Sequence, residues 1–149
     1  MTKVLLSLHV LAAVIAIGPV AVAAGMFPPA LRRAADSTES TANLYVLHRI
    51  CRVYAAVGLA VPIFGLATGA ALGVLGTGWL ITSIALTAAA AAILATMILP
   101  DQRAALSSLA AGRVDATAAR LAMSTGIFNL LWATVAVLMV VRPGSTTGA

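Results

Sequence analysis

His9 is the first residue of this 149-residue chain that could do chemistry in an apolar environment. A neutral imidazole is a common ligand of haem iron and of transition metals. Three hydroxyl-bearing residues stand at a comparable depth in other apolar stretches: Thr68, Ser83 and Thr87. The sequence therefore leaves two interpretations of His9. Either its imidazole makes a hydrogen bond to a hydroxyl or to water, or it binds haem or a metal ion in a membrane redox protein.

A second group of reactive side chains consists of His48, Cys51 and Arg52. Their spacing of i, i+3 and i+4 places them on one helix face, where they could begin a metal or anion site. Two ligands fall short of a tetrahedral set, so we expect a solvated cluster that faces lipid headgroups. His48 lies about four helical turns from His9 in depth, so the two histidines of one chain cannot hold one haem. Cys51 is the single cysteine, which excludes an internal disulfide.

Asn129 is the one carboxamide inside an apolar stretch, and Trp132 follows it by about one turn. The default expectation for Asn129 is an interhelical hydrogen bond, worth about 1 kcal/mol or less in a membrane protein. Pro19 and Pro62 also lie within apolar stretches, where we expect them to kink their helices. The alternative is that Asn129 and the carbonyl groups freed by these prolines contact a ligand.

These residues lie in or beside four long apolar stretches, residues 4–27, 53–75, 79–99 and 122–141. None of the stretches contains Asp, Glu, Lys or Arg. Each is about as long as the ~20 residues that a helix needs to cross ~30 Å of hydrocarbon. We therefore expect an all-α fold, in which residues 1–149 form a single integral membrane domain with a bundle of four transmembrane helices and short connections.

The composition excludes several classes of function. Hydrophobic residues make up 62% of the chain and charged residues 9%, too few charges to coat a soluble protein. Without a charged residue in any apolar stretch, the sequence indicates no proton relay, ion-coupling carboxylate or voltage sensor. It contains no P-loop, nucleophile elbow, HExxH or CxxC motif, and no basic helix with interleaved aromatic residues. An enzyme is thus the less favoured class, and no nucleic acid is expected as a partner.

The distribution of lysine and arginine predicts the orientation. The chain carries a net charge of +5, and seven of its nine basic residues fall in the first and third loops. Only Lys3 and Arg142 fall on the opposite side. By the positive-inside rule, loops 1 and 3 are cytoplasmic and both termini lie outside a cell (inner or plasma) membrane. The arginines expected to face the cytoplasm or the headgroups are Arg32, Arg33, Arg49, Arg52, Arg103, Arg113 and Arg120.

The first apolar stretch also has features of a secretory signal: Lys3, an apolar core, and Val-Ala-Ala at 22–24 before Gly25, which imitates a small-residue cleavage site. Cleavage before Gly25 would leave three helices and would place the four arginines of the first loop outside. We therefore expect the first helix to be retained.

Proline and acidic residues predict where the helices begin and end. Pro28 and Pro29 are expected to stop the first helix, and residues 36–39 form a capping-box-like restart. A helix from there to about residue 75 is longer than the bilayer is thick, so we expect the second helix to extend into the cytoplasm.

The third loop follows the same pattern. The pair at 100–101, Pro followed by Asp, is expected to begin a polar helical turn. Gly112 then breaks this turn, and Asp115 caps the run into the fourth helix.

Small residues predict helix packing in the second and third apolar stretches. Gly65, Gly69 and Gly73 recur every four residues, which places a smooth groove on one helix face. Residues 88–92 are all alanine and offer a similar surface. We expect tight packing inside the bundle, with an interface to a membrane-protein partner or a second copy as the alternative.

Short motifs give the chain a family resemblance. They are Leu-His-Val-Leu at residues 8–11, Gly-Pro at 18–19, Pro-Pro-Ala-Leu-Arg-Arg at 28–33 and the closing run at 138–144. With an actinobacterial-looking, alanine-rich composition, the chain resembles a bacterial family of uncharacterised four-helix integral membrane proteins, a domain of unknown function. It is more distantly similar to copper-resistance D type proteins and to four-helix protoporphyrinogen oxidases. There an early histidine is associated with haem or metal, a role that only His9 could take here.

Three functions follow from these observations. The first is a non-enzymatic accessory or scaffold subunit of a membrane assembly, indicated by the glycine face, the small loops and the absence of intramembrane charge. The second is a haem- or metal-binding redox protein that uses His9. The third is a small carrier or lipid-binding protein that uses the region of Pro19, Pro62 and Asn129.

Overall fold

The computed structural model describes residues 2–34, 38–111 and 117–144, and in these ranges every regular element is helical. The elements are α1 (Thr2–Arg33), α2 (Thr38–Val57), α3 (Ala60–Ala71), α4 (Gly78–Ile93), the π-helical segment η1 (Leu94–Ile98), α5 (Leu99–Ala110) and α6 (Thr117–Val141). Asp36 and Ser37 of the expected capping box, the expected break at Gly112 and the expected cap at Asp115 lie outside the described residues.

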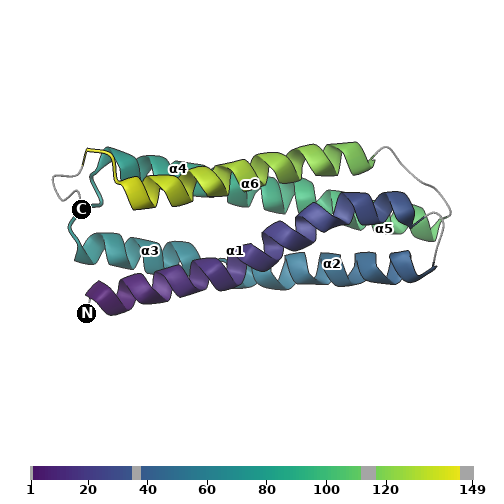
Figure 1. Ribbon diagram of the computed structural model, residues 1–149, viewed down its shortest axis with the longest axis horizontal. Helices are drawn as coiled ribbons and strands as arrows, with labels where there is room; N and C mark the ends of the chain where they lie inside the picture. Colours follow the sequence, from purple (N-terminus) through teal and green to yellow (C-terminus); the bar gives the residue numbers. More distant parts are fainter. Residues whose placement is uncertain (1, 35–37, 112–116, 145–149) are drawn as a thin grey trace.

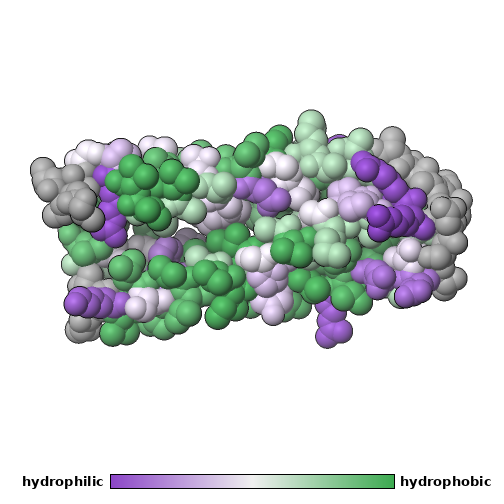
Figure 2. All heavy atoms as spheres, in the orientation of Figure 1, coloured by the Kyte–Doolittle hydropathy of each residue, from purple (hydrophilic) through white to green (hydrophobic). Residues whose placement is uncertain are grey.

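Four stretches of helix are long and apolar enough to cross a membrane, namely Lys3–Arg33, Glu39–Ala71, Gly78–Ala110 and Thr117–Val141. Figure 1 shows them lying along one common axis. The expected all-α fold with four long apolar helices is thereby confirmed. Figure 2 shows hydrophobic side chains over most of the length of the molecule, with hydrophilic ones gathered towards its ends.

The two ends of the bundle differ in what they contain. We call the end where α1 begins, α6 ends and α3 turns into α4 the terminal end, and the opposite end the basic end (Figure 1). The first three spans have 31, 33 and 33 residues, which correspond to about 47–50 Å at ~1.5 Å per residue. Each of these helices is therefore longer than the ~30 Å thickness of the hydrocarbon of a bilayer. Arg32 and Arg33 end α1 at the basic end, whereas Lys3 and Arg142 lie at the terminal end.

The first helix does not stop at Pro28 and Pro29, as the sequence predicted, but continues to Arg33. Two prolines remove two backbone hydrogen bonds from a helix. Beyond them, however, Leu31 is buried against the core, next to the fully buried Phe27. Burial of this apolar face favours continuation of the helix past the prolines.

The second span is broken near its middle, where α2 ends at Val57 and α3 begins at Ala60. Pro62 explains the break, because it has no N–H to donate to the Gly58 carbonyl one turn earlier. The Gly58 oxygen instead accepts the N–H of Val61 at 3.1 Å in a tighter turn. The second span is thus interrupted just before Pro62, whereas α1 runs through Pro19 without an interruption.

The second span ends at Ala71 rather than near residue 75, and Gly73 explains the difference. Gly73 has a φ of +67°. Its N–H bonds to the Ala70 carbonyl, and the N–H of Val74 bonds to the Gly69 carbonyl, both at 3.1 Å. This is a Schellman cap, which requires a left-handed residue and so favours glycine. The expectation that Gly73 belongs to a helix-packing face is therefore wrong.

The third span runs without interruption from α4 through η1 into α5. Pro100 lies in the first turn of α5, and the Leu99 N–H reaches back five residues to the Leu94 carbonyl. A π-helical turn of this kind accommodates irregularity inside a helix and is frequent at functional sites. The polar segment expected from Pro100 onward is present as α5, continuous with the span that precedes it.

The four spans pack unequally around the bundle. α1 lies against α2 and α3 on one side and against α6 on the other, and α4 packs on α6. By contrast, α3 and α4 touch little, although a short turn joins them. The largest fully buried side chains lie in the middle and at the basic end: Phe27, Leu44, Ile98, Leu121 and Phe128. The terminal half is therefore open along one seam, between α3 and α4.

Candidate functional site

His9 is buried on α1 and faces the second span. Its Nδ1 lies 3.0 Å from the Val61 carbonyl oxygen, and its ring rests on Gly65. A Cβ at position 65 would stand 2.9 Å from the His9 Cε1, so only glycine leaves room for the ring. Gly65 thus serves contact within the bundle.

The hydroxyl groups expected near His9 do not bind it. Thr68 donates to the Phe64 carbonyl at 2.7 Å, and Ser83 donates to the Trp79 carbonyl at 2.8 Å, each within its own helix. The third hydroxyl residue, Thr87, lines a groove on α4. Serine and threonine commonly satisfy themselves in this way in helices. The partner of His9 is therefore a backbone carbonyl rather than a hydroxyl.

The surroundings of His9 do not fit a haem. Its hollow has a volume of about 50 Å³, whereas sites for ligands of that class have roughly 300–1,000 Å³. His48, the second histidine, bonds at the basic end, and Val61 lies 13 residues further along the second span, about 20 Å by helical rise. Among the described residues, no three His, Cys, Asp or Glu side chains are grouped as a metal site would require.

A buried polar network lies at the basic end, where the sequence predicted a solvated cluster. His48 Nδ1 lies 2.9 Å from the Gln102 Oε1, and the Gln102 amide nitrogen donates to the Cys51 Sγ at 3.5 Å. His48 is buried, and Cys51 and Gln102 are 0% exposed. The expected headgroup-facing cluster is therefore wrong for His48 and Cys51, although Arg49 and Arg52 are exposed.

An ion pair joins α5 to α6 beside this network. The Arg120 guanidinium donates to both carboxylate oxygens of Asp101, with Nε to Oδ2 at 2.7 Å. Asp101 is 10% exposed and Arg120 60% exposed. Neither Asp101 nor Gln102 was predicted from the sequence as a site residue. The signal in the sequence that could have indicated this ion pair is the position of Asp101 and Arg120 on either side of the short connection between α5 and α6. Arg32, Arg33 and Arg103 are exposed, while Arg113 lies outside the described residues.

The open seam between α3 and α4 forms a groove with three hollows, which we call the seam groove. The largest, about 270 Å³, is lined from α3 by Pro62, Gly65 and Leu66 and from α4 by Leu80, Ser83, Ile84, Thr87, Ala88 and Ala91, with Met139 of α6. A second hollow of about 90 Å³, nearer the middle of the bundle and called the deep hollow below, shares Pro62, Thr87 and Ala91 with it. The hollow at His9 shares Gly65, Leu80 and Met139. The groove therefore runs from the middle of the bundle to the terminal end.

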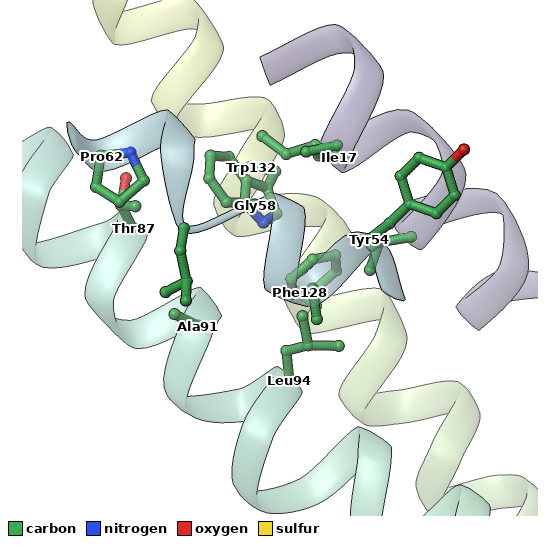
Figure 3. Close-up of a pocket in the computed structure, with 13 residues that line it drawn as sticks. Ile17, Tyr54, Gly58, Pro62, Thr87, Ala91, Leu94, Phe128 and Trp132 are labelled. Atoms are coloured by element: carbon green, nitrogen blue, oxygen red, sulfur yellow. The ribbon is translucent and has the colours of Figure 1, made fainter. Parts of the chain in front are cut away.

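Irregular backbone converges on the deep end of the seam groove. Figure 3 shows Gly58, which lies in the break between α2 and α3, near Trp132 and Phe128 of α6, with Leu94 at the start of η1 below. Pro62, in the first turn of α3, lines the same hollow. The Phe128 and Trp132 rings meet edge to face, with centroids 6.2 Å apart. Breaks in spans are tolerated where they line a cavity inside a membrane protein, and such places commonly hold ligands.

Four buried side-chain atoms have no hydrogen-bond partner among the described residues: Trp79 Nε1, Thr125 Oγ1, Asn129 Oδ1 and Trp132 Nε1. The interhelical hydrogen bond expected from Asn129 is therefore absent from the described part of the chain. Trp132 lines the deep hollow, whereas Asn129 and Pro19 do not. Of the three residues predicted to form a ligand site, Pro19, Pro62 and Asn129, only Pro62 lines this hollow. Val20 and Phe128, which are next to Pro19 and Asn129 in the sequence, line it as well.

We expect Thr125→Val to stabilise the protein. Thr125 is 3% exposed and its hydroxyl has no partner, so valine keeps the shape while removing an unsatisfied group. The gain should be about 1 kcal/mol, seen as a higher melting temperature of the protein in detergent. Thr134→Val is the matched control on α6, because the Thr134 hydroxyl already donates to Leu130 at 2.8 Å. An unchanged or lower melting temperature for Thr125→Val would show that the hydroxyl is satisfied.

Comparison of the chain with family models, with curated proteins and with solved structures found no match.

Proposed function

We propose that this chain is a multi-pass protein of the cell (inner or plasma) membrane that holds one hydrocarbon chain of a bilayer lipid in the seam groove. The observation that carries the proposal is a row of three adjoining, mainly apolar hollows along a seam where α3 and α4 touch little. An apolar groove inside the hydrocarbon region excludes water and accepts an apolar ligand.

The length of the groove suits a lipid of one leaflet. Trp132 of α6 lines the deep hollow, and Arg142, the residue after α6, lines the hollow at the terminal end. Ten residues separate them, or about 15 Å by helical rise. This is half of the ~30 Å of hydrocarbon in a bilayer. The hydrocarbon chain of a lipid whose headgroup lies at the terminal end would therefore reach Trp132, near the midplane of the bilayer.

The width of the groove favours a hydrocarbon chain over a helix. With its side chains, an α-helix is about 10–12 Å across, so a helix could lie over the seam but could not enter it. The deep hollow, lined by Pro62 and Trp132, has a volume of about 90 Å³, which is too small to take a helix. The accessory-subunit function expected from the sequence would place a partner helix on the same small residues, and the experiment below includes that outcome.

Ala91→Phe is expected to abolish lipid binding. Ala91 is exposed and lines both the deep and the largest hollow, so a phenyl ring there fills the groove without entering the core. The measurement is quenching of tryptophan fluorescence in detergent-solubilised protein by a lipid brominated near the end of its chain, because that part of the chain would lie beside Trp132 and away from Trp79. Wild type should show saturable quenching at about one lipid per chain, and Ala91→Phe should lose it.

Ala92→Phe is the matched control, because Ala92 is also exposed but lines none of the three hollows. It should bind lipid as wild type does. Equal quenching in the Ala91 and Ala92 variants would overturn the proposal. So would a protein that co-purifies in stoichiometric amount with wild type and Ala92→Phe and is lost from Ala91→Phe, since a partner helix would then be the occupant.

A further inference from the structure

The terminal end of the seam groove holds a basic side chain above an aromatic ring. Arg142 follows the last residue of α6, and its Cζ lies 5.9 Å from the centroid of the Trp79 ring of α4. Arg142 Nε also donates to the Met139 carbonyl at 3.3 Å. Both Trp79 and Met139 line the hollow that His9 shares, so the guanidinium stands at the mouth of the groove.

The backbone conformation of Arg142 places its side chain over the groove. Arg142 has a φ of +44°, the one positive φ of a non-glycine residue in the described chain. The left-handed region is unfavourable for a residue with a Cβ, by about 1 kcal/mol. Its N–H still closes the last turn of α6 on the Leu138 carbonyl at 2.9 Å. The chain therefore keeps a strained residue at the point where a guanidinium meets the mouth of an apolar groove, and strain of this kind is often retained at functional sites.

A second positive feature faces the same end. α4 begins at Gly78, and its N-cap residue Thr77 makes no side-chain capping bond, because its hydroxyl donates to the Val74 carbonyl at 2.7 Å. The first N–H groups of a helix and its dipole together attract negative charge. The N-terminus of α4 therefore reinforces the charge of Arg142, which lies over the next residue of that helix, Trp79.

Acidic side chains belong to the other end of the molecule. The two acids that the structure describes, Glu39 and Asp101, lie at the basic end, and the other two, Asp36 and Asp115, fall in the sequence between α1 and α2 and between α5 and α6. Among the described residues, the basic side chains Lys3 and Arg142 thus lie at the end of the molecule opposite Glu39 and Asp101. A phosphate in a lipid headgroup would be attracted there, whereas the ammonium group of a zwitterionic headgroup would meet no side chain of opposite charge.

We propose that the lipid in the seam groove is a net-anionic phospholipid whose phosphate binds at Arg142 and the N-terminus of α4. This inference rests on the proposed function and adds the headgroup class to it. The lipid belongs to the leaflet at the terminal end. Arg142 supplies charge-assisted hydrogen bonds to phosphate oxygens, and the apolar groove supplies affinity for the chain.

The test compares two brominated lipids with identical chains, phosphatidylglycerol and phosphatidylethanolamine, in the Trp132 quenching titration. Wild type should bind the anionic lipid about tenfold more tightly, as a single charge-assisted contact would give. Arg142→Gln should reduce this ratio to near one while retaining binding of phosphatidylethanolamine. Arg142→Lys should restore part of the preference. Lys3→Gln, which removes the other basic side chain of the terminal end, is the matched control and should leave the ratio unchanged.

Each outcome separates the headgroup inference from the groove itself. If Arg142→Gln keeps the tenfold preference for the anionic lipid, the headgroup inference is overturned, although binding of the hydrocarbon chain in the groove still holds. If Ala91→Phe binds both lipids as well as wild type does, the groove is not the site and the proposed function fails. Inorganic phosphate should not displace the anionic lipid, and displacement by phosphate alone would overturn the role of the lipid chain.

Discussion

Gly65→Ala should lower the free energy of unfolding by about 2 kcal/mol. The added methyl group would stand 2.9 Å from the His9 Cε1 and 3.2 Å from its Nδ1, so the ring must move. Movement of the ring breaks the 3.0 Å contact between Nδ1 and the Val61 carbonyl. The expected loss combines overpacking, about 1–3 kcal/mol, with a buried hydrogen bond worth about 0.5–1.5 kcal/mol. Thermal or denaturant unfolding in detergent measures it.

Two further variants isolate the contact between α1 and α3. Gly18→Ala is the matched control, because a Cβ at residue 18 of α1 meets nothing within 4 Å. It should be neutral or stabilising by up to about 1 kcal/mol, since alanine favours a helix over glycine. In the double variant His9→Ala, Gly65→Ala, the methyl group at 65 should cost little, because the ring that it displaces is gone. The two single effects should then fail to add by about 1–3 kcal/mol. Additive effects would show that residues 9 and 65 do not depend on each other.

The same glycine shows how far the sequence predicts the structure. A repeat of Gly65, Gly69 and Gly73 gives three equivalent positions, yet the structure uses them differently. Gly65 admits the His9 ring, Gly69 lies against Leu80 of α4, and Gly73 ends the helix with a positive φ. Apolar length alone predicted the number of spans, since it depends only on composition. The role of each glycine depends on neighbours far away in the sequence, which composition and spacing do not specify.

The basic end shows the same limit. His48 and Cys51 stand among exposed arginines along the chain, so a solvated cluster was the natural local interpretation. Their actual partner is Gln102, 51 to 54 residues away. Residues so far apart in the sequence meet because α5 continues the third span through η1 and so lies beside α2. The pattern around Pro100 did not indicate this arrangement. The seam groove likewise depends on the break at Gly58 and on the weak contact between α3 and α4, both tertiary features.

Gln102→Ala is expected to destabilise the basic end by about 3 kcal/mol. Gln102 is 0% exposed, so truncation leaves a cavity, and it also removes the hydrogen-bond partner of His48. Gln102→Met keeps most of the volume without the amide, and should therefore show only the polar part, about 1–2 kcal/mol. Ser107→Ala, at an exposed position on α5, is the control and should leave the melting temperature nearly unchanged.

Cys51 provides a local readout of the same change. It is the single cysteine of the chain and is 0% exposed, so alkylation of the protein by a maleimide reports on this one buried thiol. In wild type, labelling should require opening of the contact between α2 and α5. In Gln102→Ala, the labelling rate should rise at least as much as the lower free energy of unfolding alone predicts. The reason is that the substitution also leaves a cavity beside the Cys51 Sγ, which makes the thiol easier to reach. A labelling rate unchanged from wild type, together with an unchanged melting temperature, would show that Gln102 does not hold α2 to α5.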